Sequence, residues 1–227
     1  MVRVYDGRPF ALAEHLDRLG RSGASLRLEI PRAALESEIS DLLDARGGSV
    51  FDGALRIVVT RGGHRLLLTE PALEKPGTVR LATVTYAPTR ILDGVKSLSY
   101  AANMLATRLA QERGFDEALL VTPHGRVLEA PTSSLFWIDA EGHILTPPLD
   151  DHILASITRR IVMDVAEVEE RPCTMDDLRA ASQAFLASTT REAQSVTAVD
   201  DLELPVGERT LEVQRALRAR IREDLGA

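Results

Sequence analysis

The sequence has very little cysteine and no clustered histidine, which excludes several kinds of site. Cys173 is the only cysteine, so neither an internal disulfide nor a metal site built from several cysteines can form. The five histidines are scattered through the chain without the spacing of zinc ligands. We therefore expect no metal site.

Strongly basic stretches and long apolar runs are also missing. The net charge is −7, so nucleic acid is not an expected partner. No apolar run approaches the length of a membrane span, and Met1–Asp6 does not resemble a signal peptide, so we expect a cytoplasmic protein without a membrane partner. The 227 residues can bury a core as one large domain or two small ones.

Lysine is nearly absent. Of 27 basic residues, 25 are Arg, and only Lys75 and Lys96 are Lys. Arginine keeps its proton near neutral pH, whereas lysine can attack a carbonyl once its surroundings lower its pKa. Lys75 lies in Glu74–Gly77, which is typical of a surface turn. Lys96 lies among apolar residues before a predicted helix, where it is either a surface lysine with a buried stem or a nucleophile.

The order of helix and strand patterns predicts an α+β fold in two subdomains. In the first part we expect strands at 1–8, 55–60, 65–69 and 79–86, with helices over 10–27 and from Pro31 to Gly47. In the second part we expect helices over 100–113, 157–166, 175–181 and 208–225. Its short strands are expected at 117–122, 126–128, 134–138, 144–145 and 184–187. The predicted subdomains are residues 1–88 and 92–227.

Four further features could join Lys96 in one site. They are Arg18 in a predicted helix, Glu129 in a loop, Ile157–Thr158 at a helix start and Ser188–Thr190 after a strand. Each also has an ordinary explanation, because helix arginines and loop glutamates are often only solvated. Helix starts are common, and hydroxyls often serve only as caps.

Taken together, these features match the needs of pyridoxal phosphate (PLP). A lysine amine forms a Schiff base with its aldehyde, and a carboxylate pairs with its protonated ring nitrogen. A helix N-terminus, small hydroxyls and an arginine are suited to its phosphate.

At this point the sequence resembles the class IV, or fold-type IV, PLP-dependent enzymes. These include branched-chain and D-amino-acid aminotransferases, (R)-selective amine transaminases and aminodeoxychorismate lyase. The matching segments follow the family's order and cover nearly the whole chain: Glu14–Pro31, Arg56–Gly62, Lys96–Gly114, Asp116–Ile138, Ile144–Arg160 and Ala187–Val199.

The resemblance implies a role for each matched residue. Lys96 is implied as the Schiff-base lysine that then moves protons, and Glu129 as the partner of the ring nitrogen. Arg18 is implied as the arginine that binds the phosphate.

Further roles follow from the same resemblance. Ile157 and Thr158 are implied as the backbone phosphate clamp, and Thr189 as a second phosphate hydroxyl. Thr190 falls where backbone meets the substrate carboxylate, and Tyr100 near a tyrosine that some members use beside the lysine. The PLP is expected between the two subdomains of a homodimer.

The sequence departs from the family pattern in several places. Met1 falls where a hairpin of the family is already under way, so we expect shorter N-terminal strands than in the family. Three explanations stay open: the site is open, its wall comes from elsewhere, or the sequence starts too far downstream. Ser134 replaces a usual Asn, and Ala155–Ser156 a usual Gly. The segment after Arg61 is short, and we expect a plain hairpin there rather than a loop in which His64 or Arg65 binds a carboxylate.

The expected function is a PLP-dependent transaminase that moves an amino group between an amino acid or amine and a 2-oxo acid. A PLP lyase of the aminodeoxychorismate type shares the same lysine, glutamate and phosphate cup and is one alternative. A relative that binds PLP without catalysis is another. The residues leave the substrate and its stereochemistry open.

Overall fold

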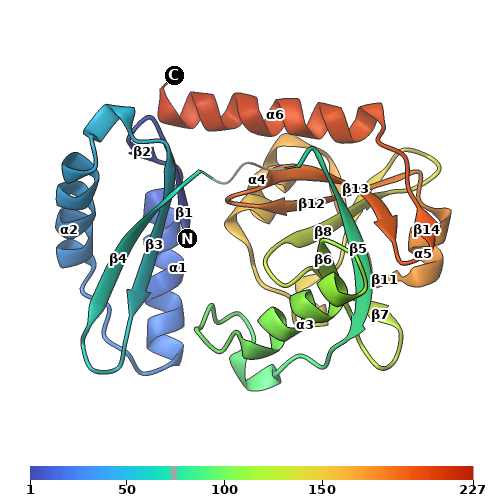
Figure 1. Ribbon diagram of the computed structural model, residues 1–227, viewed down its shortest axis with the longest axis horizontal. Coiled ribbons are helices and arrows are strands. Elements are labelled where there is room, and N and C mark those ends of the chain that lie inside the picture. Colours follow the sequence, from blue (N-terminus) through green and yellow to red (C-terminus); the bar gives the residue numbers. More distant parts are fainter. Residues whose placement is uncertain (73–75, 227) are drawn as a thin grey trace. The chain divides into compact units, whose positions relative to one another are not determined.

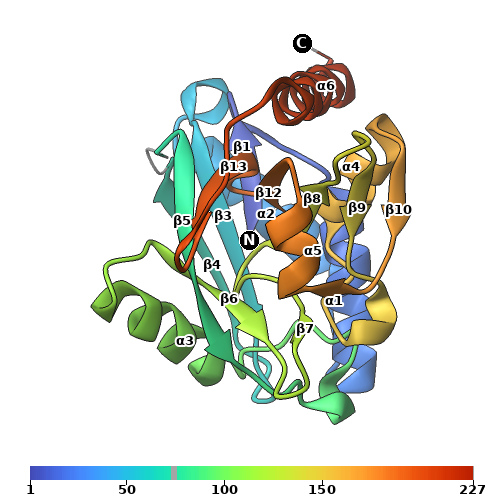
Figure 2. The same cartoon turned by 90° about the vertical axis from the view of Figure 1, so that its right-hand side faces the viewer.

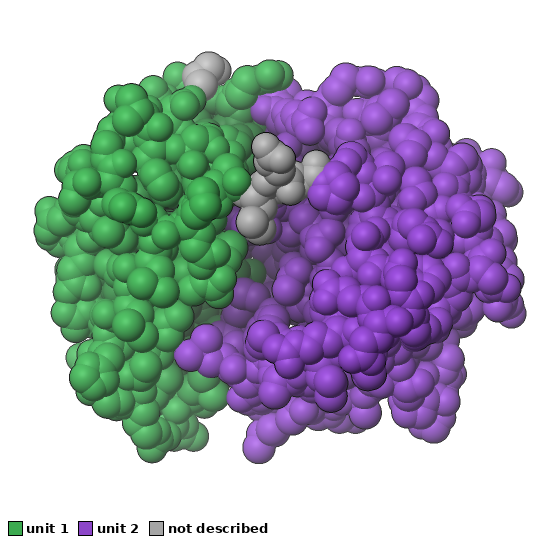
Figure 3. Space-filling view, in the orientation of Figure 1, with its two compact units in different colours: residues 1–74, 221–227 green, residues 75–220 purple. Residues whose placement is uncertain are grey.

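The computed structural model describes residues 1–72 and 76–226, so the turn expected at Glu74–Gly77 falls largely outside the described residues. The chain forms two compact units, coloured separately in Figure 3. Residues 1–74 and 221–227 make up the first unit and residues 75–220 the second. The division differs in position from the predicted boundary near Pro88, which stays a prediction.

The first unit combines a four-stranded antiparallel sheet with two helices (Figure 1). The strands are β1 (Val2–Tyr5), β2 (Arg8–Pro9), β3 (Gly53–Val59) and β4 (Arg65–Pro71), in the spatial order β2-β1-β3-β4. The helices are α1 (Leu12–Ser25) and α2 (Arg32–Ala45), and a short 3-10 turn, η1 (Gly48–Val50), follows α2. Alternate residues of β1 and β3 pack with apolar residues of both helices, because a strand directs every second side chain to one face.

The second unit is built on a ten-stranded curled sheet (Figure 2). Its main order is β10-β9-β8-β12-β13-β5-β6-β7-β11, and β14 pairs with β13. The strands are β5 (Thr78–Thr85), β6 (Glu117–Val121), β7 (Arg126–Val127), β8 (Ser134–Ile138), β9 (Ile144–Thr146), β10 (Val168–Glu170), β11 (Cys173–Thr174), β12 (Gln183–Ser188), β13 (Glu192–Val199) and β14 (Leu202–Glu203).

Strand β5 explains where the second unit begins. It pairs in parallel with β6 on one side and with β13 on the other, so its backbone groups are satisfied inside the second sheet. Parallel neighbours need long crossovers, and the connection from β5 to β6 contains η2 (Arg90–Leu92) and α3 (Ala101–Glu112). This crossover also carries Lys96.

Local capping signals set the starts of two further helices. Ser156 caps α4 (Ile157–Val165), after the 3-10 turn η3 (Leu149–Asp151), by accepting the Arg159 backbone N–H. Thr174 and Asp177 form a reciprocal capping box at α5 (Met175–Ala180). The last helix is α6 (Glu208–Leu225), whose residues up to Arg220 are assigned to the second unit and the following ones to the first.

The core of the second unit lies on both faces of the sheet. Trp137, Leu135 and Leu186 belong to one buried cluster, and Ala106 and Ala110 of α3 pack with β5 and β6 residues in another. The rings of Phe136 and Phe185 stack with centroids 4.8 Å apart across β8 and β12. The α+β class predicted from the sequence is confirmed. No helix among the described residues is long and apolar enough to cross a membrane.

Candidate active site

Lys96 lies in the loop between η2 and α3. The side chain is half-buried, and its Nζ donates to the Tyr100 hydroxyl at 3.1 Å. Tyr100 immediately precedes α3 and its backbone carbonyl accepts the Met104 N–H, so the first turn of α3 sets the position of the ring. The lysine and the tyrosine predicted from the sequence are therefore in direct contact.

Glu129 follows β7 and is held by backbone at two points. Its own carbonyl accepts the Leu120 N–H at 3.0 Å, and its carboxylate Oε1 accepts the Leu154 N–H at 3.0 Å. Burial raises the pKa of Glu129 to about 7, while the Leu154 hydrogen bond and the positive charges of Lys96 and Arg159 oppose that rise. The influence of Lys96 on this pKa shows that the two predicted catalytic groups lie in one electrostatic environment.

Tyr86 joins this cluster and was not predicted. Burial raises the pKa of its phenol, and the nearby Glu129 and Tyr100 raise it further. Its backbone N–H donates to the Val121 carbonyl at 2.8 Å, which continues the pairing of β5 with β6. In the sequence Tyr86 is simply the last residue of a predicted strand, so only the fold associates it with Glu129.

The start of α4 lies close to the turn between β12 and β13. Ile157 and Thr158 are both buried, and the Thr158 and Thr189 hydroxyl oxygens are 3.5 Å apart. A helix start provides free backbone N–H groups and a partial positive charge. Thr158, predicted as part of the backbone phosphate clamp, and Thr189, predicted as a phosphate hydroxyl, thus meet at a helix N-terminus that is suited to an anion.

The buried side chain of Arg159 connects α4 to residues outside the helix. It is almost fully buried, its Nη2 donates to the Pro147 carbonyl at 3.0 Å, and the same atom lies 3.0 Å from Glu170 Oε1 in β10. The sequence predicts a helix at Arg159 and no role for its side chain. Its charge reaches Glu129, so it acts on the site as well as on the helix.

Arg18 belongs to the first unit. It is buried in α1, with Nη2 3.5 Å from His15 Nδ1. Because Arg18 and Lys96 lie in different units, the phosphate-binding role of Arg18 stays a prediction.

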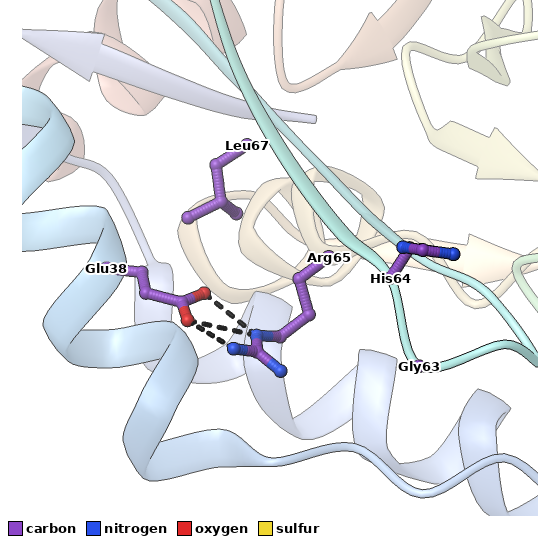
Figure 4. A pocket seen from close by; sticks show the side chains of 5 residues that line it. All are labelled: Glu38, Gly63, His64, Arg65 and Leu67. Carbon is purple, nitrogen blue, oxygen red and sulfur yellow. Dashed lines mark hydrogen bonds and ion pairs between the residues drawn. The ribbon is translucent and has the colours of Figure 1, made fainter.

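The hairpin between β3 and β4 forms as expected, closed by the Thr60 N–H and the His64 carbonyl at 3.0 Å. At its tip, Glu38, Gly63, His64, Arg65 and Leu67 line a shallow pocket in which Arg65 pairs with Glu38 of α2 (Figure 4). Arg65 is thus paired with a carboxylate of its own unit.

One group of potential metal ligands lies outside the cluster, on the exposed turn between β8 and β9. Asp139 Oδ1 accepts the backbone N–H groups of Glu141 and His143, and Asp139 Oδ2 lies 3.1 Å from His143 Nδ1. These turn contacts account for the proximity of the three side chains.

Comparison with known proteins shows the family of this chain. Residues 1–199 match the family of class IV amino-transferases. A D-alanine aminotransferase of Listeria monocytogenes is 31% identical over 92% of this chain and 80% of its own length. The chain belongs to the class IV aminotransferases.

Solved structures agree on the fold. A fold IV transaminase from Curtobacterium pusillum is 31% identical, with a TM-score of 0.80 over 97% of this chain and 83% of its own. A hypothetical aminotransferase from Mycobacterium tuberculosis in its PLP-bound form is 25% identical, with a TM-score of 0.85 over 98% and 88%. The fold-type IV architecture and the resemblance drawn from the sequence are confirmed. This class IV aminotransferase is a PLP-dependent transaminase of amino and 2-oxo acids.

The residues present suit PLP. The second unit has an amine at Lys96, a carboxylate at Glu129 held by a backbone N–H, and two hydroxyls at a helix start. These groups match the aldehyde, the ring nitrogen and the phosphate of the cofactor respectively. When bound, PLP supplies an electron sink for the carbon from which the amino group leaves.

Proposed function

We propose that the cluster of Lys96, Glu129, Thr158 and Thr189 is the PLP site, at which an amino group moves between an amino acid or amine and a 2-oxo acid. The observation that carries the proposal is the shared environment of Lys96 and Glu129. A transaminase needs both an amine that can bond the cofactor and a carboxylate that keeps the ring nitrogen protonated. Here the positive charge of Lys96 lowers the pKa of Glu129.

Lys96 is the proposed covalent anchor and proton carrier. Its Nζ must lose a proton before it can attack an aldehyde. The Tyr100 hydroxyl, 3.1 Å away, limits the orientations of the amine and can hold a proton beside it. We therefore assign Tyr100 a supporting role beside Lys96.

Glu129 is the proposed partner of the ring nitrogen. The Leu154 N–H holds one carboxylate oxygen, so the second oxygen remains available to face a bound ring. Since the pKa of Glu129 is about 7, a cationic ring nitrogen beside it would favour its ionised form. The proton shared between them would then stay on the ring side.

The proposed phosphate cup consists of the first N–H groups of α4 with the Thr158 and Thr189 hydroxyls. Ser156 accepts the Arg159 N–H, which leaves the N–H groups of Ile157 and Thr158 at the helix start for an anion. For Arg18 we propose the role that the family resemblance implies, as the arginine that binds the phosphate. Thr190, next to Thr189, is the proposed backbone contact of the substrate carboxylate.

We also propose a homodimer that forms through α3. Large apolar side chains on this helix and the preceding loop are exposed: Ile91, Leu98, Met104, Leu105 and Leu109. A monomer rarely exposes so many neighbouring apolar residues, and a self-complementary surface is the usual basis of a dimer. Light scattering of the wild type and of Leu105→Glu would test the dimer, since the charged variant should be monomeric.

A cytoplasmic location is proposed because the lone cysteine forms no internal disulfide.

The function is tested by mixing the purified chain with PLP and recording its absorbance before and after borohydride. A cofactor band that borohydride fixes onto the chain supports the proposed site. The protein is then assayed with D-alanine, branched-chain L-amino acids and chiral amines against 2-oxo acids. Formation of pyruvate and 4-aminobenzoate from aminodeoxychorismate without an amino acceptor would favour the lyase instead. Bound PLP without turnover across this panel would favour the non-catalytic alternative.

A further inference from the structure

Glu117 is a buried carboxylate that the proposed chemistry does not use. It is the first residue of β6, and 3% of its surface is exposed. Its Oε1 accepts the Thr132 hydroxyl at 3.2 Å, and its Oε2 pairs with Arg191 Nη2. Burial raises the pKa of Glu117, while Arg191 and Thr132 oppose the rise. A buried carboxylate is costly unless partners of this kind compensate it.

The Arg191 end of this pair controls the turn between β12 and β13. Arg191 comes directly after Thr189–Thr190, and its backbone N–H lies 3.4 Å from the Ser188 hydroxyl. Its Nη1 donates to Gln194 Oε1 at 2.6 Å. Gln194 is itself buried and donates to the Pro76 carbonyl at 2.6 Å. The turn is thus tied both to β6 and to the segment before β5.

The Thr132 end reaches the other half of the site. Thr132 lies three residues after Glu129 in the loop before β8. One carboxylate therefore joins the Glu129 loop to the turn that carries Thr189. Buried ion pairs contribute little net stability compared with apolar residues of similar volume, but they can fix one geometry. Positioning explains the arrangement better than stability does.

We propose that Glu117 is a positioning residue that holds the Thr189–Thr190 turn in the geometry that binds the cofactor phosphate. It acts through Arg191 and makes no contact with the cofactor itself. This inference rests on the proposed PLP site. It predicts that loss of the Glu117 charge weakens contacts to the phosphate and leaves the contacts to the pyridine ring.

Asp200 offers a matched control in the same unit. Its Oδ1 accepts the Thr83 N–H at 3.1 Å and pairs with Arg113 Nη2 at 2.5 Å, and its Oδ2 accepts the Thr83 hydroxyl at 2.5 Å. Like Glu117, it therefore binds one threonine and one arginine. Asp200 has a φ of +51°, a conformation that asparagine tolerates. Asp200→Asn thus removes an arginine–carboxylate pair that is more exposed than that of Glu117, without touching the turn at Thr189.

The experiment compares the dissociation constants of PLP and of pyridoxal, which lacks the phosphate. Glu117→Gln should weaken PLP binding by about tenfold, the size expected for a displaced charge-assisted hydrogen bond, and change pyridoxal binding by less than about twofold. Asp200→Asn should leave the ratio of the two constants unchanged. A merely structural effect would weaken both ligands equally. An unchanged ratio in Glu117→Gln would overturn the proposal.

Two further measurements keep the outcomes distinct. If circular dichroism shows that Glu117→Gln does not fold, Arg191→Gln is used instead, because it removes the more exposed partner of the same pair. We expect the same selective loss of PLP affinity in that variant. An unchanged ratio in that variant would count against the inference in the same way. A wild-type chain that binds neither ligand would contradict the proposed function itself and with it this inference. If the wild type binds both ligands and Glu117→Gln weakens both equally, only the proposed role of Glu117 is contradicted.

Discussion

The imidazole of His152 and the carboxylate of Asp93 join two loops of the candidate site, with Nδ1 2.7 Å from Oδ2. Asp93 lies three residues before Lys96, and His152 lies two residues before Leu154, whose N–H holds Glu129. His152 adopts a φ of +65°, which costs a residue other than glycine about 1 kcal/mol. The contact thus tethers the lysine loop to the segment that leads into α4.

His152→Gly should separate this tether from the stability of the fold. Glycine relaxes the left-handed backbone, while loss of a partly exposed polar contact costs at most about 1 kcal/mol. We therefore expect a free energy of unfolding within about 1 kcal/mol of the wild type, measured with urea. The amides of residues 93–100 should nevertheless exchange faster with deuterium.

Two further variants complete this test. Asp93→Asn keeps the strained backbone and loses the pair, so it should loosen the same amides and also lower the stability slightly. His143→Ala removes a second His–Asp contact, at the turn between β8 and β9, and should leave residues 93–100 unaffected. Wild-type exchange rates in both His152→Gly and Asp93→Asn would show that the pair does not restrain the loop.

Glu129 should make the stability of the cofactor-free chain depend on pH. The pKa of Glu129 is raised from 4.5 to about 7, so the folded state binds more protons than the unfolded state between these values. Stability is therefore highest below pH 4.5 as far as this group is concerned, and it falls as pH rises towards 7. One pKa unit corresponds to about 1.4 kcal/mol, which limits the loss to about 3 kcal/mol.

Glu129→Gln should remove this contribution, because the amide keeps an acceptor for the Leu154 N–H but does not ionise. Urea unfolding at pH 5 and pH 8 would measure it. The wild type should lose more stability than the variant between the two values. Equal losses would mean that the Glu129 carboxyl titrates as an exposed group does. With PLP present, the same variant should retain the cofactor and lose most of its transaminase rate.

The sequence alone predicts those helices and turns that a local residue pattern marks. The predicted helix starts at residues 157 and 175 agree with α4 and α5, which Ser156 and Thr174 cap, and the plain hairpin predicted after Arg61 agrees with β3 and β4. Strand β13 was missed, because the buried polar side chains of Gln194 and Ser195 at its centre conceal the alternation of a strand. The Gln194 side chain donates to the Pro76 and Thr78 carbonyls, which are far away in sequence.

The candidate site shows the same division. Lys96 and Glu129 could be proposed because the types of their side chains and their order match a known chemistry. The Leu154 N–H carries no signal in the sequence, since every residue except proline has one. Neither Tyr86 nor Arg159 could be assigned to the site from the sequence. The pairing of β5 with β6 and the packing of α4 bring them near Glu129. Long-range pairing therefore determines the electrostatics of the site.

Lys96→Ala should abolish the covalent adduct with PLP. Only two lysines exist in the chain, so Lys75→Arg is a complete control that removes the other amine and keeps its charge. After borohydride reduction, mass spectrometry should find the pyridoxyl group on Lys96 in the wild type and in Lys75→Arg. Transamination should fall by at least about a thousandfold in Lys96→Ala, the scale on which covalent and proton-transfer catalysis contribute. An adduct on Lys75 with full turnover in Lys96→Ala would refute the assignment.

Thr158→Val and Thr189→Val should each weaken PLP binding by about threefold to thirtyfold, since each removes one hydrogen bond to a charged phosphate. Because the two hydroxyl oxygens lie 3.5 Å apart, we expect the double variant to deviate from the sum of the single effects. Thr107→Val is the matched control: its hydroxyl donates to the Asn103 carbonyl within α3, and its loss should not affect PLP. Titration with PLP, followed by fluorescence, would give the dissociation constant of each of the four variants. A shared phosphate cup would be excluded if the two single effects were additive in the double variant and if PLP and pyridoxal were weakened equally.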